Sequence, residues 1–296
     1  MLSDIVFTGF LLPMLIAYAV GRLVLQVPRL QFASATTGLM CVSLAGVLFF
    51  EWLPLDPELH WQWLPALILF SSVLSLLVNI NSRHLGKHTE LDDSEQSGSV
   101  PEARFSLRHA IQVTLFAFLA ILTAYFLMPD WQKLNDVRFW YGIVLSMIIF
   151  TVCWMTHSGT IRARPTLSST VLALTSIATG IVLFHSGSLK FAQFAGLPAA
   201  ACIAWRLLSR NAQFKPSCIA IATPAYTIAI TGLLFCGYIN SFSSVPVACY
   251  LLCVFAPASL FFHTHDKLTL PKLALHLLPL VIAVIWATTR SLLDDL

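Results

Sequence analysis

Three threonines beside a proline are the residues whose spacing most directly suggests a chemical role. Thr223, Thr227 and Thr231 recur every four residues, so a helix would carry their hydroxyl groups on one face. Pro224 has no backbone N–H and therefore frees a carbonyl in the preceding helical turn. Such a face could offer hydrogen bonds to an uncharged substrate. It could equally bond to the carbonyls of its own helix and serve packing alone.

Two groups of histidines have the spacing of metal ligands. His263, His265 and Asp266 bring two imidazoles and a carboxylate together, and these donors would hold a transition metal if another element supplied a further ligand. A solvated turn that complements a helix C-terminus accounts for the same residues. His84 and His88 are four residues apart, but the polar sequence around them disfavours the helix that would align them. We therefore expect neither a bound metal nor another cofactor.

Ionisable side chains are nearly absent from the interior of the apolar runs. Glu51 and His276 come closest, and each lies a few residues from the end of its run. Proteins that move protons or ions usually place ionisable groups at mid-membrane, so proton-coupled antiport through a buried carboxylate is disfavoured. Glu51 stays a candidate gate or proton-exchange residue on a substrate path, with an anchor at the membrane interface as the alternative.

The composition requires that the elements carrying these residues cross a membrane. Hydrophobic residues make up 57% of the chain and charged residues 10%, with a mean hydropathy of +0.80. A helix needs about 20 apolar residues to cross a hydrocarbon core about 30 Å thick. We predict an all-α polytopic membrane protein in which residues 1–296 form a single transmembrane domain of about ten helices. The predicted spans lie near 5–25, 34–54, 60–80, 109–129, 138–158, 168–186, 190–208, 219–241, 244–263 and 271–290.

Basic residues assign an orientation to these spans. Of the seventeen Lys and Arg residues, thirteen fall into every second gap between the apolar runs and four into the others. The positive-inside rule makes the richer gaps cytoplasmic and predicts both termini on the outer face. Tryptophan rings prefer the membrane interface, so we expect Trp154 and Trp205 at the inner interface and the other six at the outer one.

Residues 81–107 depart from the membrane pattern. They are rich in charged residues, serine and histidine, with few apolar side chains to bury. We predict a mobile cytoplasmic linker between the first three helices and the remaining seven.

Other patterns predict packing and helix ends. Ala192, Gly196, Ala200 and Ala204 form a ladder of small residues that would let another helix approach closely. The tripeptide His-Ser-Gly occurs at 157–159 and 185–187, and each copy predicts a helix end closed by glycine. Seven cysteines, an odd number without a Cys-x-x-Cys pair, argue against a disulfide framework.

These features favour a transporter or permease for an uncharged or weakly charged small molecule or lipid, with a path near the seventh and eighth spans. A structural or assembly subunit of a membrane complex is one alternative. A membrane-embedded enzyme that uses His157 with the 263–266 cluster at the cytoplasmic face is another, which we favour less. No motif identifies a family, and the chain lacks a nucleotide-binding G-x-x-x-x-G-K-[ST] loop.

The expected partners follow from the same composition. Membrane lipid is the first, a membrane-protein partner or a second copy of the chain is kept open, and nucleic acid is not expected. The sequence has no Asn-x-Ser/Thr glycosylation acceptor, which permits a bacterial plasma membrane as the location.

Overall fold

The computed structural model describes residues 7–50, 59–92, 100–131, 136–241, 245–262 and 270–294, with side chains described over 7–48, 59–80, 109–131, 136–241, 245–262 and 273–293. Every regular element within these ranges is a helix. The elements in chain order are η1 (Phe7–Leu11), α2 (Leu12–Gln26), η2 (Gln31–Ala33), α3 (Ser34–Phe50), η3 (His60–Trp63), α4 (Leu64–Asp92), α5 (Val100–Leu127), α6 (Arg138–Arg162), α7 (Pro165–His185), α8 (Leu189–Leu208), α9 (Pro216–Ile239), α10 (Val247–Phe255), η5 (Ala256–Phe262) and α11 (Leu270–Asp294).

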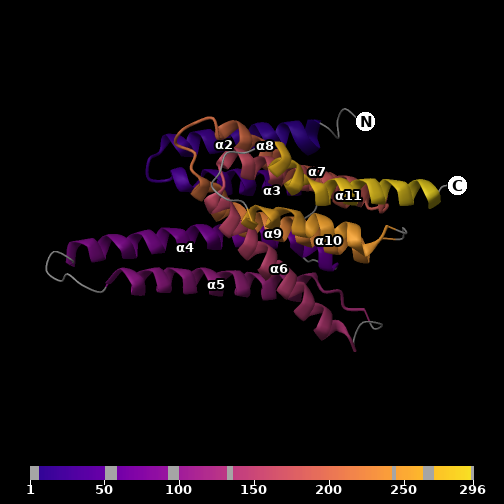
Figure 1. Cartoon of the computed structure of the whole chain (residues 1–296), viewed down its shortest axis with the longest axis horizontal. Helices are drawn as coiled ribbons and strands as arrows, with labels where there is room; N and C mark the ends of the chain where they lie inside the picture. Colours follow the sequence, from indigo (N-terminus) through magenta and orange to yellow (C-terminus); the bar gives the residue numbers. More distant parts are fainter. Residues whose placement is uncertain are drawn as a thin grey trace.

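The prediction of an all-helical chain is confirmed for the described residues. Nine helical segments among the described residues are long and apolar enough to cross a membrane. The predicted span near 244–263 folds as a shorter apolar segment, Val247–Phe262, whose second half is a 3₁₀ helix. The long helices lie roughly side by side, and α6 crosses the others obliquely (Figure 1).

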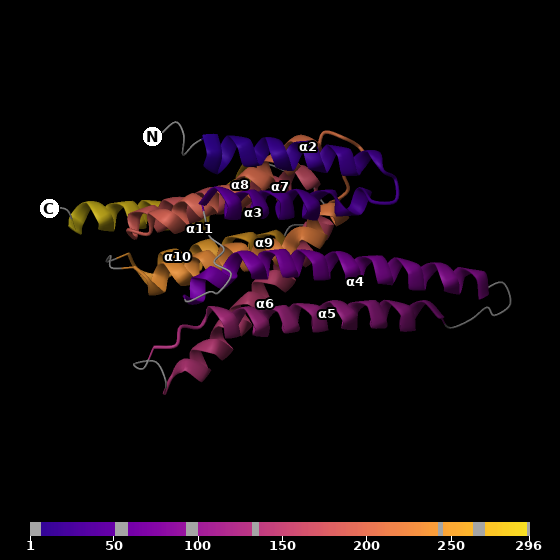
Figure 2. The ribbon, with the colours of Figure 1, turned by 180° about the vertical axis from the view of Figure 1, so that it is seen from behind.

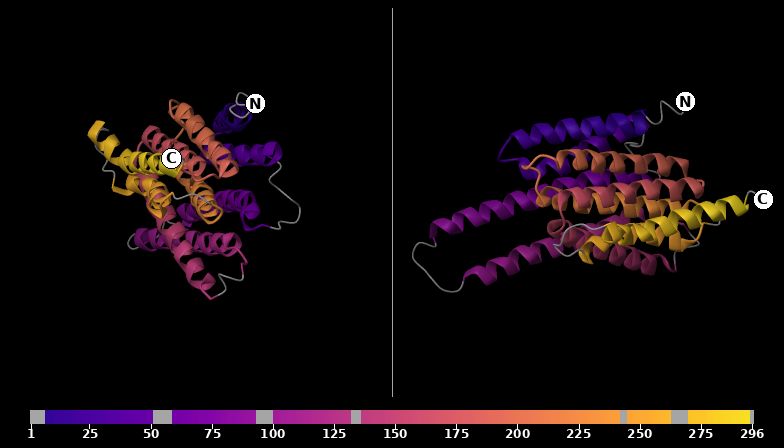
Figure 3. Two further views of the ribbon diagram at one scale, coloured as in Figure 1. Left: turned by 90° about the vertical axis from the view of Figure 1, so that its right-hand side faces the viewer. Right: turned by 45° about the horizontal axis from the view of Figure 1, so that its top comes forward.

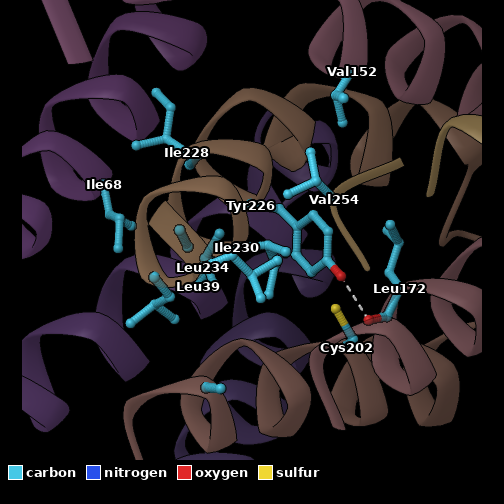
Figure 4. Close-up of a cluster of buried hydrophobic side chains, with 14 of the residues drawn as sticks. Leu39, Ile68, Val152, Leu172, Cys202, Tyr226, Ile228, Ile230, Leu234 and Val254 are labelled. Carbon is cyan, nitrogen blue, oxygen red and sulfur yellow. Dashed lines mark hydrogen bonds between the residues drawn. The ribbon is translucent and has the colours of Figure 1, made fainter. Parts of the chain in front are cut away.

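Helix α9 forms the centre of this bundle. Its residues from Cys218 to Leu234 are all buried, and α3 to α8 and α10 pack around it. This stretch has no charged residue and many small ones, so neighbouring helices can enclose it on every side. Figure 4 shows Tyr226 in this core, where its hydroxyl donates a hydrogen bond of 2.6 Å to the carbonyl of Leu172 on α7.

Small residues bring several helices close together. Gly196, from the predicted ladder on α8, lies so near the carbonyl oxygen of Gly9 that an added Cβ would be 3.1 Å from it. On α7, a Cβ at Gly180 would lie 3.4 Å from the carbonyl oxygen of Ala192. The ladder residues Ala200 and Ala204 of α8 are buried. The structure thus places ladder residues at close helix contacts, between α8 and both η1 and α7.

One of the two predicted His-Ser-Gly helix ends is confirmed, and the other is wrong. After His185, Gly187 adopts a positive φ of 78° and the helix closes, with the N–H of Ser188 donating to the carbonyl of Leu183. By contrast, α6 continues through Gly159 to Arg162. Gly159 allows close packing instead: an added Cβ would lie 2.5 Å from the carbonyl carbon of Leu260.

The helices also extend into the segment predicted as a linker. Over 81–107, α4 continues to Asp92 and α5 begins at Val100, so the expectation that no helix forms around His84 and His88 is wrong. A helix that continues from an established one needs no new nucleus, and one glycine costs only about 1 kcal/mol. The two extensions project beyond the other helices (Figure 3, right). Whether residues 81–107 are mobile and cytoplasmic stays a prediction.

The tryptophans behave differently from one another. Trp140 is 65% exposed on the outside of the bundle, as an interfacial ring should be, whereas Trp205 is completely buried. Trp205 therefore does not face lipid as predicted. It lies one turn before the end of α8, where α2 and α3 cover this helix.

The close contact of Gly159 gives the first prediction. Gly159→Ala should destabilise the protein by about 1–3 kcal/mol, because the added methyl group meets the backbone of Leu260 and Phe261. Gly142→Ala is the matched control in the same helix: nothing lies within 4 Å of its added Cβ. The control should be neutral or stabilising by about 0.5–1 kcal/mol. Thermal unfolding in detergent, followed by tryptophan fluorescence, measures both. Equal melting temperatures for the two variants would contradict this packing.

Candidate functional site

A broken helical hydrogen bond in α9 is the starting point of the candidate site. Pro224 lies inside this helix and has no N–H to donate to the carbonyl of Ala220, four residues earlier. His157 of α6 occupies the free position, with Nδ1 2.9 Å from the Ala220 oxygen. Because a carbonyl oxygen can only accept, Nδ1 must carry the proton. The histidine therefore replaces the donor that the proline lacks.

Hydroxyl groups link the same two helices one turn away. Thr160 of α6 donates to the carbonyl of His157 at 2.8 Å, and its oxygen lies 3.4 Å from the hydroxyl of Thr223 on α9. Thr223 also donates to the carbonyl of Ile219 at 3.2 Å. This predicted path residue thus bonds back to its own helix, as the packing interpretation expects, and in addition contacts α6.

The other two threonines of the predicted stripe behave differently. Thr227 and Thr231 are each 2% exposed. Their hydroxyl oxygens have no hydrogen-bond partner among the described residues. A buried hydroxyl without a partner costs about 1–3 kcal/mol. These two positions therefore hold unused hydrogen-bonding capacity within the protein interior.

A small polar cavity adjoins His157 and Pro224. It has a volume of about 30 Å³ and lies between α4, α5, α6 and α9. That volume corresponds to roughly one water molecule. Its polar lining consists of Ser75, Asn79, Gln112 and His157, and Pro224 contributes an apolar wall. Thr223, Thr227 and Thr231 are not among the described residues that line it.

Aromatic rings fix the orientation of His157. Phe116 packs against the imidazole edge-to-face at a centroid distance of 5.1 Å, and Trp154 packs against Phe116 at 6.2 Å. His109 of α5 continues the row, 4.8 Å from Trp154. The ring of His157 is thus held by packing on one side and by the Ala220 carbonyl on the other.

Several polar residues of the cavity were not predicted as site residues. Ser75 and Asn79 are four residues apart in the third apolar run, and Gln112 lies near the start of the fourth. Polar residues repeated at helical spacing within an apolar run are the signal that could have identified them. Their partners on other helices could not be identified in this way.

The remaining predicted residues contribute less to this site. Glu51, His263, His265 and Asp266 lie outside the described residues, so their predicted roles stay predictions. His276 is buried, and its Nδ1 lies 3.0 Å from the hydroxyl of Ser259. Within the described part of the chain, no three His, Cys, Asp or Glu side chains are grouped to hold a metal ion.

Comparisons with protein-family models, with curated proteins and with solved structures found no match to this chain.

The bond between His157 and Ala220 can be tested by a double-mutant cycle. His157→Leu should cost about 1–3 kcal/mol, since the buried carbonyl loses its donor. In a Pro224→Ala background the new N–H can donate to the same carbonyl, so the cost should fall by about 1 kcal/mol. Thermal unfolding in detergent measures all variants.

Pro198→Ala in α8 provides the control for this cycle. Pro198 also lies inside a helix, whereas the carbonyl that His157 Nδ1 pairs with is that of Ala220 on α9. Its substitution should leave the cost of His157→Leu unchanged. An equal cost of His157→Leu in the Pro224→Ala and wild-type backgrounds would refute the replacement of the missing donor by histidine.

Proposed function

We propose that this chain is a transporter or permease for an uncharged or weakly charged small molecule or lipid, with its path alongside α9. The observation that carries the proposal is the buried, proline-interrupted helix with two hydroxyl groups, on Thr227 and Thr231, that lack partners among the described residues. Buried polar groups are normally satisfied. A substrate that passes these positions would supply the missing hydrogen bonds without needing a charge on the protein.

The proposed topology has ten spans with both termini on the outer face. Segment Val247–Phe262 combines nine α-helical residues with seven in a 3₁₀ helix. The larger rise of the 3₁₀ part gives it a length of about 27 Å, close to the 30 Å core. η1 begins and α11 ends at the same end of the bundle (Figures 1 and 2), as an even number of crossings requires.

A bacterial plasma membrane is the location that we propose. The distribution of Lys and Arg between alternate loops follows the positive-inside rule, and the sequence has no Asn-x-Ser/Thr acceptor.

Pro224 gives the proposed path a point at which α9 can change shape. The Ala220 carbonyl is held by a side chain of another helix instead of by its own backbone. This bond can break and re-form without unwinding a regular helical turn. The small cavity beside it, of about 30 Å³, fits a closed state in which no continuous route is open.

The small size of this cavity also favours a second function, a structural or assembly subunit. Such a subunit would need an interface with a membrane-protein partner or a second copy, and no route through its interior. The two hypotheses differ in whether the hydroxyl groups on α9 affect permeation.

Thr227→Val together with Thr231→Val tests the transport hypothesis. Removing an unpaired buried hydroxyl should leave stability unchanged or raise it. Loss of about 1 kcal/mol of hydrogen bonding to substrate at each site should slow permeation by about tenfold or more. Proteoliposomes would be assayed for glycerol entry by light scattering and for movement of a fluorescent phospholipid between leaflets by dithionite quenching.

Thr36→Val on α3 is the matched control. Thr36 is also completely buried, and its hydroxyl also has no partner among the described residues. This variant should keep the wild-type rate. Wild-type protein that accelerates neither probe over empty liposomes, or an α9 variant with undiminished permeation, would sink the proposal and leave the structural subunit as the better hypothesis.

A further inference from the structure

A polar notch lies at the end of the bundle where α2 ends and α8 ends. α2 and α8 pack side by side (Figure 2), and the notch opens between their last turns with a volume of about 380 Å³. This volume is within the range of small-molecule sites. Its lining comprises two arginines, a tyrosine, an asparagine and two leucines: Arg22, Arg210, Tyr18, Asn211, Leu207 and Leu208.

The charge of this notch is positive and uncompensated among the described side chains. Arg22 and Arg210 are both exposed. Asp130 and Asp136 are the only acidic residues whose side chains are described, and Asp130 is paired with Arg138 in the segment between α5 and α6. Two guanidinium groups facing one notch repel each other unless an anion lies between them. The notch therefore favours an anionic ligand.

The two guanidinium groups of the notch are donors, and three backbone carbonyl groups near them are already paired. The carbonyl oxygens of Trp205, Leu207 and Leu208 would otherwise repel an anion at the end of α8. They already accept the N–H groups of Ser209, Arg210 and Asn211 at 2.8, 3.3 and 2.8 Å.

The side chain of Asn211 adds to this donor character. Its Oδ1 accepts the N–H of Gln213 at 3.0 Å, which leaves its NH₂ group to donate. Together with the guanidinium groups and the Tyr18 hydroxyl, the notch presents the donors that a phosphate oxygen accepts.

An apolar stripe leads from the notch along α2 to the end of η1. Leu15, Tyr18 and Arg22 are spaced three and four residues apart with a helical period, and Leu11 precedes Leu15 by four residues. Leu15 is 54% exposed and Leu11 41% exposed. From Arg22 to Leu11 the stripe is about 16 Å long, close to half of a 30 Å hydrocarbon core. An acyl chain that starts at the notch has this length available.

We propose that the notch binds the headgroup phosphate of an anionic phospholipid, whose acyl chain lies along Leu15 and Leu11. The planar guanidinium group of arginine can donate to two phosphate oxygens at once in a fixed geometry, whereas the ammonium group of lysine acts as a point charge. Basic pockets between transmembrane helices at the cytoplasmic side bind such headgroups. A zwitterionic lipid brings its own cation to the site, so the arginines select a phosphatidylglycerol-type headgroup over phosphatidylcholine.

Native mass spectrometry of the purified full chain in detergent tests this site. With phosphatidylglycerol, the wild-type protein should retain one lipid at least tenfold more often than with phosphatidylcholine. Arg22→Gln with Arg210→Gln should reduce the phosphatidylglycerol adduct about tenfold. Tyr18→Phe, which removes only a hydroxyl group, should reduce it two- to fivefold. It also provides a test if the double variant does not fold.

Arg206→Gln is the matched control, since Arg206 is an exposed arginine of α8 that does not line the notch. It should keep wild-type lipid binding. An equal loss in this control would show general charge attraction and overturn the proposal, as would undiminished binding in both notch variants. Inorganic phosphate at millimolar concentration should not displace the lipid. Complete displacement would assign the notch to a free anion and overturn the lipid assignment.

Discussion

The carbonyl group of Ala220 needs a hydrogen-bond donor from outside its own helix, and the centre of this protein supplies one. Lipid cannot pair a carbonyl that a proline has freed, and leaving such a group unpaired in an apolar interior is costly. His157 satisfies it from another helix at 2.9 Å. The bond joins α6 to α9 where the two helices pack together, and the hydroxyl groups of Thr160 and Thr223 lie in contact close to it. The polar cavity opens beside this crossing because α4 and α5 bring their own polar side chains to it.

Small residues make that approach sterically feasible. Gly159 lies in the same turn of α6 as His157. It lets α6 contact the backbone of η5 at Leu260. On α9, a Cβ at Gly232 would lie 2.4 Å from a terminal methyl group of Leu64 and 3.1 Å from one of Leu127, so the side chains of these two leucines pack against the glycine. Lipid tails are as apolar as leucine, so burying apolar surface gives little net gain between membrane helices. Close packing and hydrogen bonds have to hold them together.

The sequence predicts most of the helices well because an apolar run of about 20 residues is a local property that can be read directly. It predicts less well where tertiary packing decides, as at Gly159, where the helix continues, and at Trp205, which other helices cover. The proline could be identified because its missing N–H is a local property. Its partner His157 could not, because 63 residues separate the two bonded groups and only the fold brings them together.

On the proposed topology, the basic residues at one end of the bundle would serve lipid binding as well as orientation. The positive-inside rule counts lysine and arginine alike, yet nine of the thirteen residues in the predicted cytoplasmic gaps are arginine. Membrane topology does not require arginine in place of lysine. Arginine is useful where an anion must be bound with a defined geometry as well as by charge. The notch at Arg22 and Arg210 has that geometry: its carbonyl groups are already paired and an apolar stripe continues from it. Orientation and lipid binding would then draw on the same side chains. In the uncharged interior around α9, the polar side chains include threonine hydroxyl groups and the imidazole of His157.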